Sequence, residues 1–253
     1  MADGDSELGR AVSSAGGERR LVAQDVVAGY GNHEVLHGVS VRSHEGITCV
    51  LGPNGSGKST LLKTLAGNLQ PWSGSIRFGD VDITGASSHD VVREGIVYVP
   101  QDGGLFPSMT VRENLRLGAH TVDDADVVAD RLDVVLEVFP ALESKLSQRA
   151  RSLSGGQQMM LAFARAMMTG ADLYELDEPL AGLAPSIVDD ILEHVVTLAE
   201  QDVQVILVEQ QVRSALEIAD HVYLLAQGEI KFDGSADDLS DEDELMDLYL
   251  GID

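Results

Sequence analysis

The feature that most constrains this chain is the stretch from Gly52 to Ser59, which fits the pattern G-x-x-x-x-G-K-[S/T] at every position. An apolar run at residues 47–51 precedes it and a helical pattern at residues 60–66 follows, which is the strand–loop–helix context that a P-loop requires. The glycines let successive backbone N–H groups point into one phosphate-binding concavity at the positive end of a helix. In such a loop Lys58 reaches the β- and γ-phosphates of a nucleotide, and the Ser59 hydroxyl binds Mg²⁺. The sequence therefore predicts an ATP and Mg²⁺ site that comprises Gly52, Pro53, Asn54, Gly55, Ser56, Gly57, Lys58, Ser59 and Thr60.

Length and charge limit the classes of protein to which the chain can belong. Its 253 residues suit one large domain, or one domain with a subdomain, and can bury a substantial core. The chain carries 42 acidic and 17 basic residues, and a net charge of −25 disfavours binding to nucleic acid or to an anionic membrane surface. This acidity fits either a solubilising surface or a halophile protein, in which high salt screens the self-repulsion. We favour the halophile interpretation, which predicts that stability depends on salt.

Neither end of the chain nor its apolar segments indicate export or membrane insertion. Residues 1–20 contain acidic residues, Gly and Ser without an apolar core, so we expect a disordered acidic N-terminal tail and no signal peptide. No apolar run reaches about 18 residues, so we expect no transmembrane segment. Cys49 is the single cysteine and cannot form an intrachain disulfide, which favours a reduced, cytoplasmic setting.

Strand and helix patterns alternate along the chain. This alternation predicts an α/β fold with a mostly parallel sheet and helices on its faces. Residues 100–153 form a mostly helical insert, which we expect to be a second lobe. We expect strands at residues 21–28, 35–41, 47–51, 75–78, 81–83, 96–99, 172–177, 203–208, 222–225 and 229–232, and helical segments within 110–149 and at 185–200, 213–220 and 237–250.

A second chemical motif lies at the end of the strand that contains Asp177. In open α/β sheets ligands bind at the carboxyl ends of the strands, where an aspartate such as Asp177 can hold Mg²⁺. The adjacent Glu178 can accept a proton from an attacking water. Glu175 lies two residues before Asp177 and faces the same side of the strand, where an unpaired carboxylate would be costly or take up a proton. We expect Glu175 either to find a partner, such as Lys58, or to perturb the Mg²⁺ site and weaken folding or activity.

A third motif, LSGGQ, opens a helical stretch and gives a second anion site through a Ser hydroxyl and Gly amides. One nucleotide does not need two phosphate sites in one chain, whereas two chains placed head to tail would use both. The P-loop and this signature, which stands before the Asp177 strand, together resemble those of the ABC ATPases over about residues 21–253. The signature residues are Leu153, Ser154, Gly155, Gly156 and Gln157.

The resemblance implies an ABC ATPase fold: a P-loop NTPase core with an antiparallel β subdomain and an inserted helical subdomain at about residues 102–152. It implies that Tyr30 stacks on adenine and that Gln101 contacts Mg²⁺ or the lytic water. Each ATP would lie between the Lys58 loop of one subunit and the Ser154 helix start of the other.

Gln210 occupies the position at which most members of this family have a histidine. A Gln amide can donate a hydrogen bond to a γ-phosphate but does not titrate near neutral pH, so the resemblance leaves Glu178 as the base and Gln210 as a sensor. The segment around Gln210, residues 182–185 and the ending at 249–251 are similar to the ATPase subunits of branched-chain amino-acid importers and their urea and short-amide relatives.

The implied partners are a transmembrane permease, a second ATPase subunit in a homodimer or heterodimer and, indirectly, a substrate-binding protein; no nucleic acid is implied. The implied location is the cytoplasmic face of the membrane. The alternative is a soluble ABC ATPase that serves a protein assembly, such as iron–sulfur cluster biogenesis.

Overall fold

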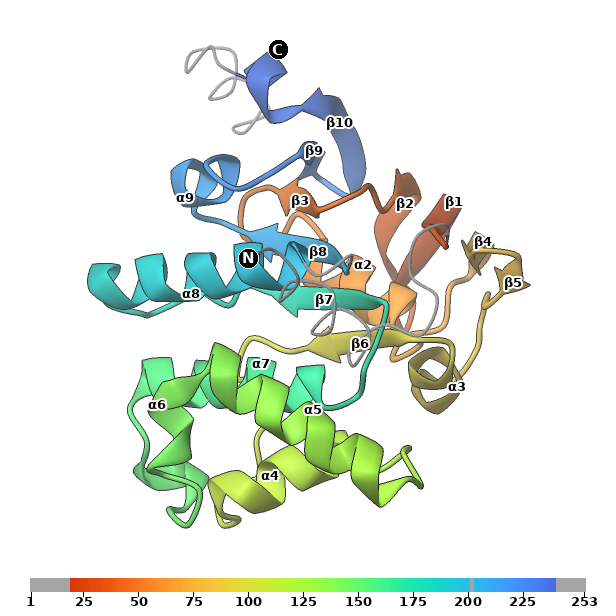
Figure 1. Ribbon diagram of the computed structural model, residues 1–253. Coiled ribbons are helices and arrows are strands. Elements are labelled where there is room, and N and C mark those ends of the chain that lie inside the picture. Colours follow the sequence, from red (N-terminus) through yellow and green to blue (C-terminus); the bar gives the residue numbers. More distant parts are fainter. Residues whose placement is uncertain (1–18, 201–202, 240–253) are drawn as a thin grey trace, which may run out of the picture.

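Two β-sheets and several helices make up the part of the chain that the computed structural model describes, residues 19–200 and 203–239 (Figure 1). The larger sheet has six strands in the order β10-β9-β3-β8-β7-β6. Strands β9, β3, β8, β7 and β6 are parallel to one another, and β10 runs antiparallel to β9. This arrangement confirms the predicted α/β fold with a mostly parallel sheet. The strands are β3 (Ile47–Leu51), β6 (Ile96–Val99), β7 (Leu173–Asp177), β8 (Gln204–Glu209), β9 (His221–Ala226) and β10 (Glu229–Ser235).

Helices cover both faces of the larger sheet. In β3, Cys49 and Leu51 pack in a core with residues of α7, α8 and α9, whereas Val50 points to the opposite face and packs with Leu61 and Leu62 of α2. Burial on both sides explains why this strand is apolar throughout instead of alternating with polar residues. The helices are α2 (Lys58–Leu65), α7 (Gly155–Met167), α8 (Pro185–Ala199) and α9 (Val212–Leu216).

A smaller antiparallel sheet packs on the α2 side of the larger one. Its order is β2-β1-β4-β5, and its buried residues, such as Leu36 and Ile76, share a core with Leu61 of α2. In Figure 1 these strands lie beside β3 and α2. The smaller sheet confirms the antiparallel β-region that the resemblance implied. Its strands are β1 (Leu21–Tyr30), β2 (His33–Arg42), β4 (Ser73–Phe78) and β5 (Val81–Asp82), and α3 (Ser88–Arg93) connects it to β6.

The helical stretch predicted within residues 110–149 is divided into short helices, which lie together on the β6 side of the larger sheet (Figure 1). Helix α4 begins at a capping box in which Thr110 and Glu113 bind each other's backbone N–H groups. Helix α5 begins at Asp124, whose carboxylate accepts from two backbone N–H groups, and α6 begins at Pro140. A separate subdomain at 102–152 remains a prediction. The segments are α4 (Val111–Gly118), α5 (Ala125–Val138), α6 (Pro140–Glu143) and the 3₁₀ helix η1 (Ala150–Ser152).

The structure differs from the sequence-based expectation near the C-terminal end. The helix predicted at residues 213–220 ends at Leu216, because the backbone N–H and side chain of Asp220 both bind the backbone of Ile47 and turn the chain into β9. In the helix predicted at 237–250, the described residues belong to the 3₁₀ helix η2 (Ala236–Leu239), and the rest lies outside the described part of the chain. Residues 1–18 of the predicted tail also lie outside it. In the described residues, no helix is long and apolar enough to cross a membrane.

Candidate functional site

The P-loop connects β3 to α2, as the sequence predicted. Gly57 stands at the N-terminal cap of α2 with a φ of 111°, and a Cβ there would approach Leu36 Cδ2 to 2.9 Å. Lys58 is 4% exposed, and its Nζ donates to the carbonyls of Gly52 at 2.8 Å and Pro53 at 3.2 Å. These contacts fold the lysine side chain back onto the first residues of the loop.

Asp177 lies at the end of β7 and faces the start of α2. Its carboxylate is 4% exposed and accepts two hydrogen bonds, from Ser59 Oγ to Oδ1 at 2.9 Å and from the Tyr98 hydroxyl to Oδ2 at 2.8 Å. Burial and the bond to Asp177 raise the pKa of Tyr98, so this hydroxyl remains a donor. A serine hydroxyl and a carboxylate brought together in this way are the hard oxygen ligands that Mg²⁺ prefers, so the residues fit that ion.

Glu178 follows Asp177 with an unusual backbone. Its φ is 46°, in the left-handed region, and its N–H donates to the Val208 carbonyl of β8 at 2.9 Å. Its carboxylate Oε1 lies 3.1 Å from Nζ of Lys58, with side-chain exposures of 14% and 3% respectively. The candidate base and the candidate phosphate-binding lysine therefore form a largely buried ion pair.

The strand order places the remaining predicted groups at the same edge of the sheet. Strands β3, β8, β7 and β6 are parallel neighbours, so the segments that leave their carboxyl ends lie side by side. The P-loop follows β3, Gln210 follows β8, Asp177 ends β7, and Gln101 comes shortly after β6. Gln101 and Gln210 are both exposed at this edge.

Tyr30 ends β1, beside the turn to β2, and is 49% exposed. Its ring therefore has a free apolar face. In the described part of the chain, no hydrogen bond joins Tyr30 to the P-loop, so its link with the site stays a prediction.

The signature segment forms the start of α7. Ser154 caps this helix and exchanges hydrogen bonds with Gln157 in a capping box, and a Cβ on Gly156 would come within 2.5 Å of Ile187 Cγ2 on α8. Among the described residues, no hydrogen bond or ion pair connects residues 153–157 to residues 52–60. Within one chain the structure therefore keeps the two predicted anion sites on separate elements.

Glu175 lies where the sequence predicted, on the same face of β7 as Asp177, but Lys58 is not its partner. Glu175 is 0% exposed, and in the described part of the chain neither of its carboxylate oxygens has a hydrogen-bond partner. Burial, followed by the charge of Asp177, raises its pKa well above the usual range. Lys58 does not pair with Glu175, because it binds Glu178 and two P-loop carbonyls.

Sequence reasoning did not assign a role to two residues that touch this site, Tyr98 and Glu209. Tyr98 carries the one polar side-chain group in the apolar run before Gln101, and this feature could have identified it. Glu209 ends the apolar strand β8 and is 1% exposed; its carboxylate accepts from the backbone N–H groups of Leu180 and Gln210. Burial raises the pKa of Glu209 and these backbone bonds oppose the increase.

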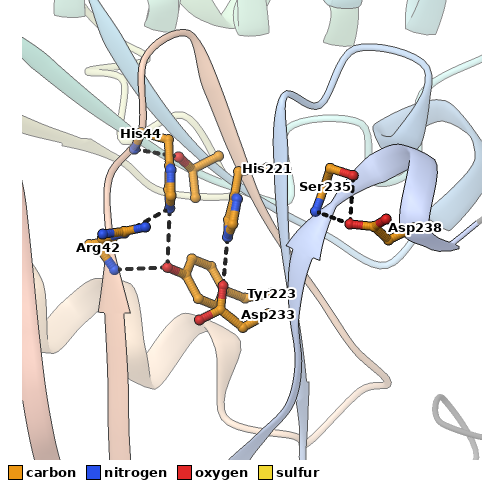
Figure 2. Close-up of polar contacts among 8 residues, drawn as sticks. Arg42, His44, His221, Tyr223, Asp233, Ser235 and Asp238 are labelled. Atoms are coloured by element: carbon orange, nitrogen blue, oxygen red, sulfur yellow. Dashed lines mark hydrogen bonds and ion pairs between the residues drawn. The ribbon is translucent and has the colours of Figure 1, made fainter.

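A second polar cluster lies at the opposite end of the sheet, where β3 and β9 begin (Figure 2). The rings of His44 and His221 stack with centroids 3.6 Å apart, and His44 Nε2 lies 3.3 Å from both Arg42 Nε and the Tyr223 hydroxyl. Burial and the nearby positive charges of His221 and Arg42 lower the pKa of His44 to about 4, against the opposing charge of Asp233. This cluster joins the small sheet to the large one, far along the strands from the P-loop.

Comparisons with known proteins agree with the fold. The family model described as "ABC transporter" matches residues 36–181. The chain is 40% identical over 227 residues to a probable branched-chain amino acid transport ATP-binding protein, LivF, of Archaeoglobus fulgidus, covering 89% of this chain and 96% of the relative. It is 42% identical over 223 residues to the high-affinity branched-chain amino acid transport ATP-binding protein BraG of Pseudomonas aeruginosa, covering 88% and 95%. A crystal structure of the ADP conformation of an ABC transporter's ATP-binding cassette superimposes with a TM-score of 0.81 at 28% identity, covering 92% of this chain and 99% of that one.

Proposed function

Since the chain belongs to the ABC transporter family and is one of its ATP-binding, ATP-hydrolysing subunits, we propose that it drives a membrane importer for branched-chain amino acids. The observation that carries the catalytic part is the convergence of Lys58, Ser59, Asp177 and Glu178 at one edge of the sheet.

We assign a chemical role to each predicted site residue. Lys58 and the P-loop amides bind the phosphates, and the exposed ring of Tyr30 stacks on adenine. Glu178 accepts the proton of the attacking water, and Gln210 donates a hydrogen bond to the γ-phosphate.

Ser59, Asp177 and Gln101 would hold a magnesium ion. When bound, Mg²⁺ neutralises charge that develops on the phosphate oxygens. Tyr98 and Ser59 fix the rotamer of Asp177, which orients the carboxylate before it meets the ion.

The active form is a dimer with two ATP molecules at its interface. Ser154 and Gly156 of a second subunit supply the other wall of each site, because the helix start they form belongs to a different element from the P-loop of their own chain. A second copy of this chain and a homologous ATPase subunit both fit this arrangement.

The permease docks in an apolar groove beside the Gln101 loop. This groove has a volume of about 350 Å³ and lies between β6, α4 and α7. Phe106, which is 48% exposed, lines it together with Val97, Leu117 and Arg165. A helix of the permease bound in this groove would respond to movement of Gln101, because a short loop joins Gln101 to Phe106. The subunit would then work at the cytoplasmic face of the membrane, with a substrate-binding protein as an indirect partner.

The solute is proposed from the relatives, two of which are named as branched-chain amino acid transport ATP-binding proteins. The alternative, a soluble ATPase of a protein assembly, has no such support.

Co-purification in detergent tests the transport role. We expect a permease with several membrane-spanning helices to co-purify, and Phe106→Asp to release it without lowering basal ATP hydrolysis. Val81→Asp is a matched control, because Val81 is also an exposed apolar residue but lies on β5 in the small sheet. A soluble assembly protein in place of the permease would contradict the proposal.

A further inference from the structure

Glu209 connects the two loops that carry Glu178 and Gln210. Its Oε1 accepts from the backbone N–H of Leu180 at 2.9 Å, and its Oε2 accepts from the backbone N–H of Gln210 at 3.1 Å. Leu180 lies two residues beyond Glu178 in the loop that follows β7, and Glu209 is 1% exposed. One buried carboxylate therefore spans the gap between the candidate base and the candidate γ-phosphate sensor.

Gln211 binds the other backbone polar group of Leu180, the carbonyl. Its Nε2 donates to the carbonyl of Leu180 at 3.3 Å, and Leu180 is itself 0% exposed. Both backbone polar groups of Leu180 are thus bound by the two side chains that flank Gln210. Because the carbonyl and the N–H are both engaged, the peptides around Leu180 cannot rotate without breaking a buried bond.

The backbone of Glu178 explains why this loop needs such support. A φ of 46° is unfavourable for a residue with a Cβ, and Pro179 further restricts the residue that precedes it. Conformations of this kind persist at functional sites only where the surrounding structure determines them. The Glu178 N–H is fixed by Val208, and the contacts to Leu180 supply the next fixed point along the chain.

We propose that Glu209 and Gln211 are positioning residues that hold the Glu178 carboxylate in register with Gln210. The inference rests on the proposed role of Glu178 as general base. A base and a γ-phosphate donor must meet the same water and phosphate in one geometry, and small displacements cost large factors in rate. ATP affinity depends on Lys58 and the P-loop amides, which these contacts do not touch. The pair therefore acts mainly on kcat, because it leaves the direct phosphate contacts of Lys58 and the P-loop amides in place.

Two variants test this role in the full chain. Glu209→Gln replaces one acceptor oxygen with an NH₂ group that faces a backbone N–H. Gln211→Ala removes only the bond to the Leu180 carbonyl, at an exposed position where the fold is retained. We expect kcat to fall about tenfold and about threefold respectively, with the ATP dissociation constant within about twofold of the parent. Glu217→Gln, the same change at an exposed position on the turn after α9, is the control and should match the parent.

Hydrogen–deuterium exchange separates positioning from a general loss of stability. In both variants we expect faster exchange at residues 180–184 and unchanged exchange in β10, whereas general destabilisation would accelerate both segments. Unchanged exchange at 180–184, or faster exchange there with unchanged kcat, would overturn the proposal. A loss of ATP affinity as large as the loss of kcat would also overturn it. Failure of the proposed catalytic role is distinguishable, because it would appear as normal turnover in Glu178→Gln, whatever the exchange of the loop.

Discussion

Nζ of Lys58 and Oε1 of Glu178 lie 3.1 Å apart, in a pair of side chains that are both largely buried. Phosphate oxygens are the other natural partners of Lys58, so ATP competes with Glu178 for this ammonium group. Nucleotide binding at the proposed site would then exchange one anionic partner of the lysine for another and free the carboxylate to face water. The pairing would link occupancy of the P-loop to the availability of the proposed base within a single contact.

The hydroxyl of Tyr98 gives the first prediction. Tyr98→Phe removes its bond to Asp177 and leaves the strand packing intact. A hydrogen bond to a charged group contributes about 1.5–3 kcal/mol, so we expect a higher Mg²⁺ concentration for half-maximal ATPase activity. Titration of activity with Mg²⁺ measures this shift. Tyr223→Phe, in the remote cluster of Figure 2, is the control, and identical Mg²⁺ curves for the two variants would reject the role of Tyr98.

Glu175 gives a prediction about stability. Glu175→Leu removes a buried carboxyl group for which the described part of the chain offers no hydrogen-bond partner. Relieving the burial of such a group by about 1–3 kcal/mol would raise the melting temperature by roughly 2–12 °C in a domain of this size. Thermal unfolding followed by circular dichroism provides the measurement. An unchanged or lower melting temperature would show that the carboxyl group is accommodated at no cost.

His44 makes stability depend on pH in a defined window. Its pKa is lowered from 6.5 to about 4, so between these values the unfolded chain binds a proton that the native chain does not. The contribution of neutral His44 is complete above pH 6.5 and is lost as the pH falls towards 4. In His44→Gln, the side-chain amide still offers an acceptor to the Tyr223 hydroxyl but does not titrate.

Urea unfolding at pH 7 and at pH 5 measures this effect. We expect the parent to lose more unfolding free energy than His44→Gln between about pH 7 and pH 5, values that lie above and within the titration window. Equal losses in the two proteins would indicate that His44 has the ordinary pKa of histidine in the native protein, which would contradict the prediction.

The net charge of −25 gives a prediction about salt. If the acidity reflects a halophile protein, repulsion among its negative charges destabilises the fold at low salt. Added salt screens this repulsion at separations beyond a few ångströms. We expect the melting temperature to rise by several degrees between low salt and molar KCl. Equal stability at both salt concentrations would favour the simpler interpretation, a solubilising surface.

The P-loop and the strand patterns were predictable because their chemistry depends on neighbours in sequence. Gly57 and Lys58 stand at fixed offsets from one another, and an apolar strand such as β3 is recognisable from its own residues. The fold class followed from the alternation of strands and helices, and the structure confirms it.

Contacts between segments far apart in sequence were not predictable. Lys58 was one possible partner for Glu175, but in the structure it pairs with Glu178, whose backbone lies in the left-handed region at the end of β7. The bonds of Tyr98 to Asp177 and of Glu209 to Leu180 depend on which strands are neighbours in the sheet. Sequence periodicity does not specify that order.

The most direct test of the catalytic account is the Glu178→Gln variant. It keeps the size of the side chain, removes the proton acceptor and weakens the competitor for Lys58. The account predicts ATP binding at least as tight as in the parent, single-turnover hydrolysis slower by about 10²-fold or more, and a dimer that accumulates with ATP in size-exclusion chromatography. Normal hydrolysis by this variant, or a protein that remains monomeric with bound ATP, would contradict it.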